Sequence, residues 1–228
     1  MKTLKLLKRN MSIITRINQL ILGVTFLGLV GCSQDPAKKE LPYYGEDEVL
    51  VQNEAGEDEI VTEHRKVNDF SFIDQDSNII TPETVKGKVY VVDFFFTSCP
   101  TICPKMKQQM LRIYDKYKDN RDVVLLSHSI DIRNDTVPKL KRYAEKLGIE
   151  SQKWHMVTGE KDAIYGIAKS YILPAQEDKS AAGGYLHSGQ FVLMDGEHHI
   201  RGYYDGTVPE DVDLLMDDME VLLKQQAK

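Results

Sequence analysis

The chain has 228 residues, a formal net charge of −6, 28% charged residues and 42% hydrophobic residues. This composition is typical of one globular domain with short appendages, and it excludes a wholly disordered chain. The acidic balance argues against a nucleic-acid-binding protein, which would present a basic face, and three cysteines are too few for a disulfide-rich scaffold.

The first 31 residues are typical of an export signal. They contain five basic residues and no acidic residue, and an apolar run over 20–30 ends before Gly31 and Cys32. Because a membrane span needs about 20 apolar residues, this shorter run predicts a signal peptide over residues 1–31. Residues 29–32, Leu-Val-Gly-Cys, resemble a bacterial lipobox, which implies cleavage before Cys32 and lipidation of its thiol. The alternative is an uncleaved signal anchor, and both place the rest of the chain outside the cytoplasm.

Residues 32–66 are expected to form a lipidated, acidic tether. Ten acidic and four basic residues lie between 33 and 66, and short strands are predicted at 49–51 and 60–61. Removal of residues 1–31 with their five basic residues changes the net charge from −6 to −11. The folded domain is predicted to occupy residues 67–228.

Strand and helix patterns alternate from residue 67 onward. Apolar residues at 70–72 and 79–80 flank an Asp-Ser-Asn turn, which predicts a hairpin. The runs 88–96, 123–126 and 154–157 predict buried strands, and helical spacing predicts helices over 102–117, 136–148 and 158–171. An Asp-Gly turn at 195–196 predicts a hairpin of strands 190–194 and 199–204. A capping box at 207–210 then predicts a last helix that reaches residue 222.

This order of elements predicts an α/β fold. Strands joined by crossover helices lie parallel and the late hairpin adds antiparallel strands, so we expect a three-layer sandwich with a mixed sheet. A cysteine-bearing motif between the first buried strand and its helix is typical of a thioredoxin-like fold. The C-terminal hairpin and helix are additions to that core.

Cys99 and Cys103 are the main chemical signal. Once Cys32 is lipidated they are the remaining thiols, so in an oxidising compartment they form a disulfide, a redox pair or a metal site. A spacing of four can place both sulfurs on one face of a helix mouth, where the helix dipole favours thiolates. A structural zinc site usually needs four ligands, whereas two thiolates and an imidazole suit copper. The alternative is a pair of inert buried thiols.

Six histidines can supply the imidazole. His187 follows a glycine-rich loop that passes the cysteine helix in a thioredoxin-like fold, so it is the preferred ligand. His128 ends a buried strand, where open α/β sheets place their sites, and it is the second choice. The others lie in the tether, in a strand or beside the hairpin turn: His64, His155, His198 and His199.

Three motifs in this order resemble the Sco/SenC family, and the resemblance covers about Asn68 to Leu223. They are Asp-Phe-Phe-Phe-Thr-Ser-Cys-Pro-Thr-Ile-Cys-Pro-Lys-Met at 93–106, Ser-Ile-Asp-Ile-Arg-Asn-Asp-Thr at 129–136 and Leu-His-Ser-Gly at 186–189. The resemblance implies that Cys99, Cys103 and His187 bind Cu(I) or Cu(II) in a membrane-tethered thioredoxin fold. It also implies a role in maturing the binuclear copper centre of cytochrome c oxidase, by delivering copper or by reducing that centre's cysteines.

The expected partners follow from the same resemblance. They are the copper-bearing subunit of cytochrome c oxidase or another copper or thiol carrier, and the membrane through the lipid anchor, with no nucleic acid. Two other functions stay open. One is an extracytoplasmic thiol–disulfide reductase in which Cys99 and Cys103 are a redox pair without a metal. The other is an inert lipoprotein that reuses the fold.

The motif at 129–136 departs from the family's usual Asp-Pro-x-x-Asp-Thr. Ile132 replaces the proline, while Asp131, Asp135 and Thr136 remain. The resemblance implies that an aspartate supports the site, and we expect Asp131 or Asp135 to act around the ligands more than as a ligand. The alternative is that Asp135 and Thr136 only cap the next helix.

Overall fold

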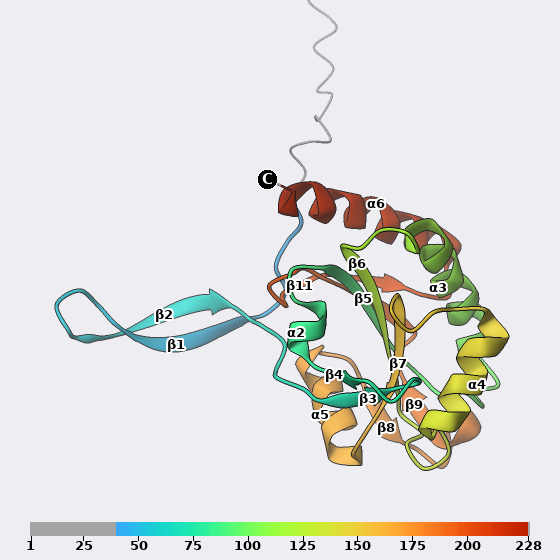
Figure 1. The fold of residues 1–228 in the computed structure, drawn as a ribbon. Helices are drawn as coiled ribbons and strands as arrows, with labels where there is room; N and C mark the ends of the chain where they lie inside the picture. The colour runs from blue at the N-terminus through green and yellow to red at the C-terminus, as the bar shows by residue number, and fades with distance from the viewer. Residues whose placement is uncertain (1–39, 228) are drawn as a thin grey trace, which may run out of the picture. The chain divides into compact units, whose positions relative to one another are not determined.

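A seven-stranded mixed sheet with helices on both faces forms the centre of the protein (Figure 1). A computed structural model describes residues 40–227, so the predicted signal peptide and Cys32 lie outside the described part. The strand order is β11-β10-β5-β6-β7-β3-β4. The bounds are β3 Phe72–Asp74, β4 Ile79–Ile80, β5 Val89–Phe95, β6 Val123–Ser129, β7 Trp154–Thr158, β10 Gln190–Met194 and β11 Ile200–Asp205. Strands β5, β6 and β7 are parallel, and β10 and β3 join them antiparallel.

The two central strands explain why the sequence predicts an α/β fold. Every residue of β5 and β6 is buried, as expected for strands that are mostly apolar and covered on both faces. Crossover helices α3 (Cys103–Tyr117) and α4 (Val137–Leu147) connect β5 to β6 and β6 to β7. Alternation along β5 sends Asp93 toward α3, where it lines a small cavity with Cys103, and sends Phe94 toward Tyr171 after α5 (Lys161–Ser170). The thioredoxin-like expectation is confirmed.

The last helix, α6 (Pro209–Gln226), packs along α3 and β11. Tyr117 of α3 donates its hydroxyl hydrogen to the Met216 carbonyl at 3.0 Å or to Glu220 at 2.9 Å, which ties the two helices together. The predicted capping box at its start is wrong. Thr207 donates to Asp205 at 2.6 Å, and the helix begins at Pro209 after Val208 without a side-chain cap.

Three other details depart from the sequence expectations. Helix α5 begins at Lys161, because Thr158 still belongs to strand β7. A short helix, α2 (Pro82–Val85), has too few residues to show a periodic pattern. A separate two-stranded sheet of β8 (Ala175–Glu177) and β9 (Tyr185–His187), with the 3₁₀ turn η2 (Ala182–Gly184) between them, also lay outside the predicted elements.

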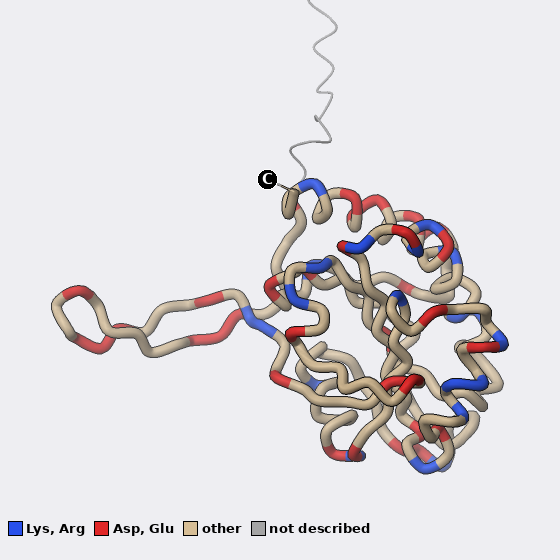
Figure 2. The backbone as a smooth tube through the Cα atoms, in the orientation of Figure 1, with Lys and Arg blue, Asp and Glu red and all other residues tan. Residues whose placement is uncertain are grey.

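The segment expected to be a tether contains a β-hairpin. Its strands are β1 (Glu46–Gln52) and β2 (Asp58–His64), which pair antiparallel with Leu50 opposite Ile60. The short strands predicted at 49–51 and 60–61 lie within it. Single bridges from Tyr44 to Ile200 and from Lys66 to His199 hold its base to the domain. Figure 2 shows acidic residues along the hairpin.

Candidate metal centre

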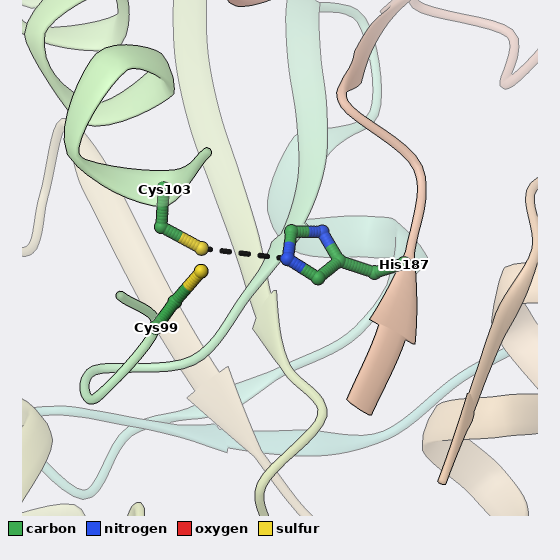
Figure 3. A group of neighbouring side chains, drawn as sticks. All are labelled: Cys99, Cys103 and His187. Atoms are coloured by element: carbon green, nitrogen blue, oxygen red, sulfur yellow. Dashed lines mark hydrogen bonds between the residues drawn. The ribbon is translucent and has the colours of Figure 1, made fainter. Parts of the chain in front are cut away.

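Cys99, Cys103 and His187 converge at one end of the sheet. Their ligand atoms all lie within 4.8 Å of one another, and they form the one such group of three or more metal-binding side chains found within residues 40–227. Both cysteines are buried, free thiols and His187 is half-buried. Figure 3 shows both sulfurs beside the imidazole ring. The structure therefore brings together the three residues that the sequence selected.

The two cysteines occupy different local structures. Strand β5 ends at Phe95, the Cys99 backbone N–H donates to the Phe96 carbonyl in a turn at 3.2 Å, and helix α3 begins at Cys103 itself. Pro100 disfavours helical backbone at the residue before it, so Cys99 stays in the turn. The sulfurs thus meet from a turn and a helix start, instead of from one helical face as the spacing suggested.

His187 comes to the cysteines from the other side, at the end of β9. Its Nδ1 lies 3.0 Å from the Ser188 carbonyl oxygen, and a carbonyl only accepts, so Nδ1 carries the hydrogen. In the neutral ring Nε2 then has the free lone pair, and it lies 3.4 Å from the Cys103 sulfur. This tautomer presents the nitrogen that a metal needs to the thiols.

Close packing joins two segments at the site. One is the cysteine turn, residues 96–102 between β5 and α3, and the other is the histidine arm, residues 182–187 of η2 and β9. The Phe96 ring meets the His187 ring edge-on, with centroids 5.7 Å apart. Gly183 of η2 has a φ of +81°, and a Cβ built there would lie 2.8 Å from the Phe96 ring. Only glycine satisfies both the backbone and the space, so Gly183 lets this arm lie against the turn.

The two thiols have opposite acidities. Burial opposes ionisation of Cys99, but hydrogen bonds from the Cys103 thiol and from nearby backbone N–H groups overcome it and lower the pKa of Cys99 to about 6. Burial, and then the adjacent Cys99 group, raise the pKa of Cys103 far above its ordinary value. In the metal-free protein Cys99 is therefore the thiolate at neutral pH and Cys103 keeps its hydrogen.

Asp135 fixes the position of the cysteine turn through hydrogen bonds. It is fully buried and accepts hydrogen bonds from the Thr97 backbone N–H at 2.8 Å, the Thr97 hydroxyl at 2.6 Å and the Ser129 hydroxyl at 2.7 Å. Lys139 balances its charge at 3.0 Å. Because Thr97 lies two residues before Cys99, these bonds set where the first sulfur stands.

Asp131 makes the corresponding contact to the histidine arm. Its carboxylate accepts the Tyr185 hydroxyl hydrogen at 2.8 Å and the Asn134 side-chain amide at 2.9 Å. Tyr185 lies two residues before His187 on β9. Neither Asp131 nor Asp135 belongs to the three-residue ligand group found in the described chain.

We expect Asp135→Ala to destabilise the fold and loosen the site together. The buried Ser129 hydroxyl and the half-buried Thr97 donors would lose their acceptor, and a buried donor without a partner costs about 1–3 kcal/mol of unfolding free energy. Copper affinity should fall by about 10–100-fold, as for other groups that orient metal ligands. Denaturant unfolding and copper competition measure the two effects. Exposed Asp119→Ala is the control, and equal copper affinity in both variants would refute a positioning role for Asp135.

His128 is not at this site. It is fully buried, its ring stacks on Phe94 with centroids 4.9 Å apart, and neither ring nitrogen has a hydrogen-bond partner. Burial lowers the pKa of His128 to about 3, so the ring stays neutral. It shares the Phe94 side of the sheet, whereas Cys103 lines a cavity with Asp93 on the opposite side. The strand-end argument therefore selected a core residue.

Two residues around the site were missed from the sequence. Tyr185 carries the bond from Asp131, and Asp93 lies buried between β5 neighbours, with the Ser127 hydroxyl donating to it. Burial raises the pKa of Asp93 to about 6, against the lowering effect of that bond. An acidic residue inside an otherwise apolar strand was the available signal for Asp93. No sequence signal distinguishes Tyr185 from any other tyrosine.

Comparison with known proteins decides the family. A family model described as SCO1/SenC matches residues 59–223. The chain belongs to that family. The SCO1 protein homolog of Bacillus subtilis is 28% identical over 211 residues, which span 90% of this chain and 95% of that protein.

Solved structures of Sco proteins share the fold. A SCO1/SenC family lipoprotein from Bacillus anthracis is 27% identical with a TM-score of 0.64, over 70% of this chain and 95% of that one. BsSco, described as having a disulfide switch and as a member of the Sco family of cytochrome c oxidase assembly proteins, is 28% identical with a TM-score of 0.60, over 69% and 93%. Arabidopsis thaliana ScoI with copper bound is 29% identical with a TM-score of 0.57, over 71% and 98%.

Proposed function

We propose that this Sco family member binds copper through Cys99, Cys103 and His187. The observation that carries the proposal is the convergence of two thiols and one imidazole within 4.8 Å. Soft thiolates and a neutral imidazole match Cu(I), and the same ligands also accept Cu(II). The Cys99 thiolate and the free His187 Nε2 require little reorganisation for binding, and Cys103 releases its hydrogen when it becomes a ligand. A copper-bound plant relative supports this assignment.

The role we propose is assembly of the binuclear copper centre of cytochrome c oxidase, by copper delivery, thiol reduction or both. BsSco, described as a Sco family assembly protein, supports it. The partner would be the copper-bearing oxidase subunit or another copper or thiol carrier. In cells that produce this chain, Cys103→Ser should lower cytochrome c oxidase activity severalfold. Exposed Ser98→Ala should not, and full oxidase activity in Cys103→Ser cells would contradict the role.

The low pKa of Cys99 favours thiol–disulfide exchange as a second activity of the same pair. The Cys99 thiolate would attack one sulfur of a partner disulfide, and the other partner sulfur would leave as a thiolate. Cys103, after giving its proton to the partner thiolate that has just left, would attack the Cys99 sulfur and release the second partner thiolate. The pair loses two electrons and becomes a disulfide, and the partner disulfide gains them. Such a disulfide would remove both thiolate ligands for copper.

We further propose that the domain is anchored outside the cytoplasm by lipid on Cys32. The leader and the lipobox-like residues 29–32 support this, and one structural relative is described as a lipoprotein. In the described part of the chain, no helix is both long enough and apolar enough to cross a bilayer. Mass spectrometry of the mature N-terminus should find a lipid-modified Cys32. An unmodified Cys32 or an intact Met1 would overturn the proposal and favour a signal anchor.

A further inference from the structure

A hollow of about 300 Å³ opens on the surface between α4 and the cysteine turn. Its lining consists of Thr97 from the turn and Lys139, Arg142, Tyr143 and Lys146 from α4. Three of these five side chains are cationic, although the chain as a whole carries a net charge of −6. The hollow is therefore a locally basic surface on a protein whose net charge is negative.

The cations around the hollow are largely free of acidic partners. Lys139 pairs with the buried Asp135, but Arg142 and Lys146 make no ion pair among the residues that the structure describes. Lys107 of α3 adds a fourth cation, with its ammonium 5.4 Å from the centre of the Tyr143 ring. Side chains that the chain itself leaves unneutralised are available to attract a negatively charged partner.

Neither cysteine lines the hollow, but two of its lining residues connect it to the thiol pair. Thr97 lies two residues before Cys99 and is fixed by Asp135. Tyr143 lines both the hollow and the small inner cavity that contains Cys103 and Met106. A protein that approaches Cys99 from the α4 side of the turn would lie over the surface beside Thr97. The basic hollow is part of that surface, so its charge bears on which partners come close.

We propose that this hollow, lined by Lys139, Arg142 and Lys146, docks an acidic segment of the protein that exchanges thiols or copper with Cys99 and Cys103. The inference rests on the proposed function, since it names the partner surface for that same site. Charge complementarity favours a local acidic segment of a protein. A nucleic acid would also meet the many acidic groups elsewhere on this chain, including the hairpin 46–64.

The test uses two cysteine peptides that differ only in four flanking residues, glutamate in one and glutamine in the other. Each peptide is activated as a mixed disulfide with an aromatic thiol. The reduced full chain, in detergent, attacks the peptide sulfur and releases the coloured aromatic thiolate, whose appearance gives the rate. At about 0.01 M salt, where screening is weak, the glutamate peptide should react about tenfold faster than the glutamine peptide.

Charge reversal locates the effect. Arg142→Glu combined with Lys146→Glu should abolish or invert the preference for the glutamate peptide, and the corresponding glutamine variants should reduce it. The matched control is Lys86→Glu with Lys118→Glu, two exposed lysines before β5 and after α3, at the ends of these elements away from the cysteines. This control makes the same change in net charge, and it should keep most of the preference.

Several results would overturn the docking site. Equal rates of the two peptides with the wild-type chain would do so, as would the same loss of preference in the control. Concentration-dependent dimerisation of the wild type that the charge reversal removes would assign the hollow to the acidic hairpin of a second copy. The proposed function fails separately, because copper binding by the wild type and by the Arg142 and Lys146 variants is measured without any peptide.

Discussion

Replacing His187 by alanine should separate copper binding from thiol chemistry. The variant loses the imidazole whose Nε2 faces the Cys103 sulfur at 3.4 Å, so copper affinity should fall by more than about 100-fold, beyond the usual effect of removing an orienting group. Thiol–disulfide exchange should change by less than about tenfold. The Cys103 thiol and the backbone N–H groups that lower the pKa of Cys99 stay in place, so Cys99 remains the attacking thiolate.

Copper competition and exchange with a small neutral disulfide measure the two effects on the same preparation. His64→Ala is the control, because His64 lies on the hairpin and stacks on Tyr43, apart from the ligand group. If His187→Ala keeps wild-type copper affinity, the histidine is not a ligand. If copper binding and exchange both vanish, the variant has lost more than a ligand, and the proposed division of roles is wrong.

Alkylation of the reduced, metal-free protein should modify Cys99 first, with a rate that rises through about pH 6. The sign follows from the lowered pKa of Cys99, because the thiolate is the reacting form and accumulates above that pKa. Above about pH 7.5 the rate should level off, whereas an ordinary thiol is only half ionised at about pH 8.5. Cys103 should stay largely unmodified, because burial and the adjacent Cys99 raise its pKa.

Peptide mapping after partial alkylation identifies the modified residue, and the pH dependence of the rate gives the pKa. In Cys103→Ala the loss of the Cys103 thiol, which lowers the pKa of Cys99 through a hydrogen bond, should move the midpoint to higher pH. Preferential labelling of Cys103, or a midpoint near that of a free thiol, would contradict the assigned asymmetry.

The central architecture could be predicted because its signals are local. The apolar runs that became β5 and β6 have no polar face, and only a sheet covered on both sides buries them. The β8–β9 sheet could not be predicted in this way. Its strands have three residues each, and they are held by pairing with each other and by the close approach of Gly183 to Phe96. Contacts of that kind appear only in three dimensions.

The same distinction applies to the site. The cysteine pair was predicted from residue type and spacing, and His187 from the glycine-rich loop before it and the family resemblance. The structure brings the three together. His128 was misjudged because the end of a buried strand can point to either face of the sheet. The hydrogen bonds from Thr97 to Asp135 and from Tyr185 to Asp131 could not be predicted from the sequence, since each joins residues that are distant along the chain.

X-ray absorption at the copper edge, on reduced full chain loaded with Cu(I), tests the central claim most directly. We predict one copper per chain, with two sulfur neighbours and one imidazole nitrogen supplied by Cys99, Cys103 and His187. Cys103→Ser should lose one sulfur neighbour, and His187→Ala should lose the nitrogen. A copper environment of nitrogen and oxygen only, or one that is unchanged in both variants, would contradict the claim that these three residues form the copper site.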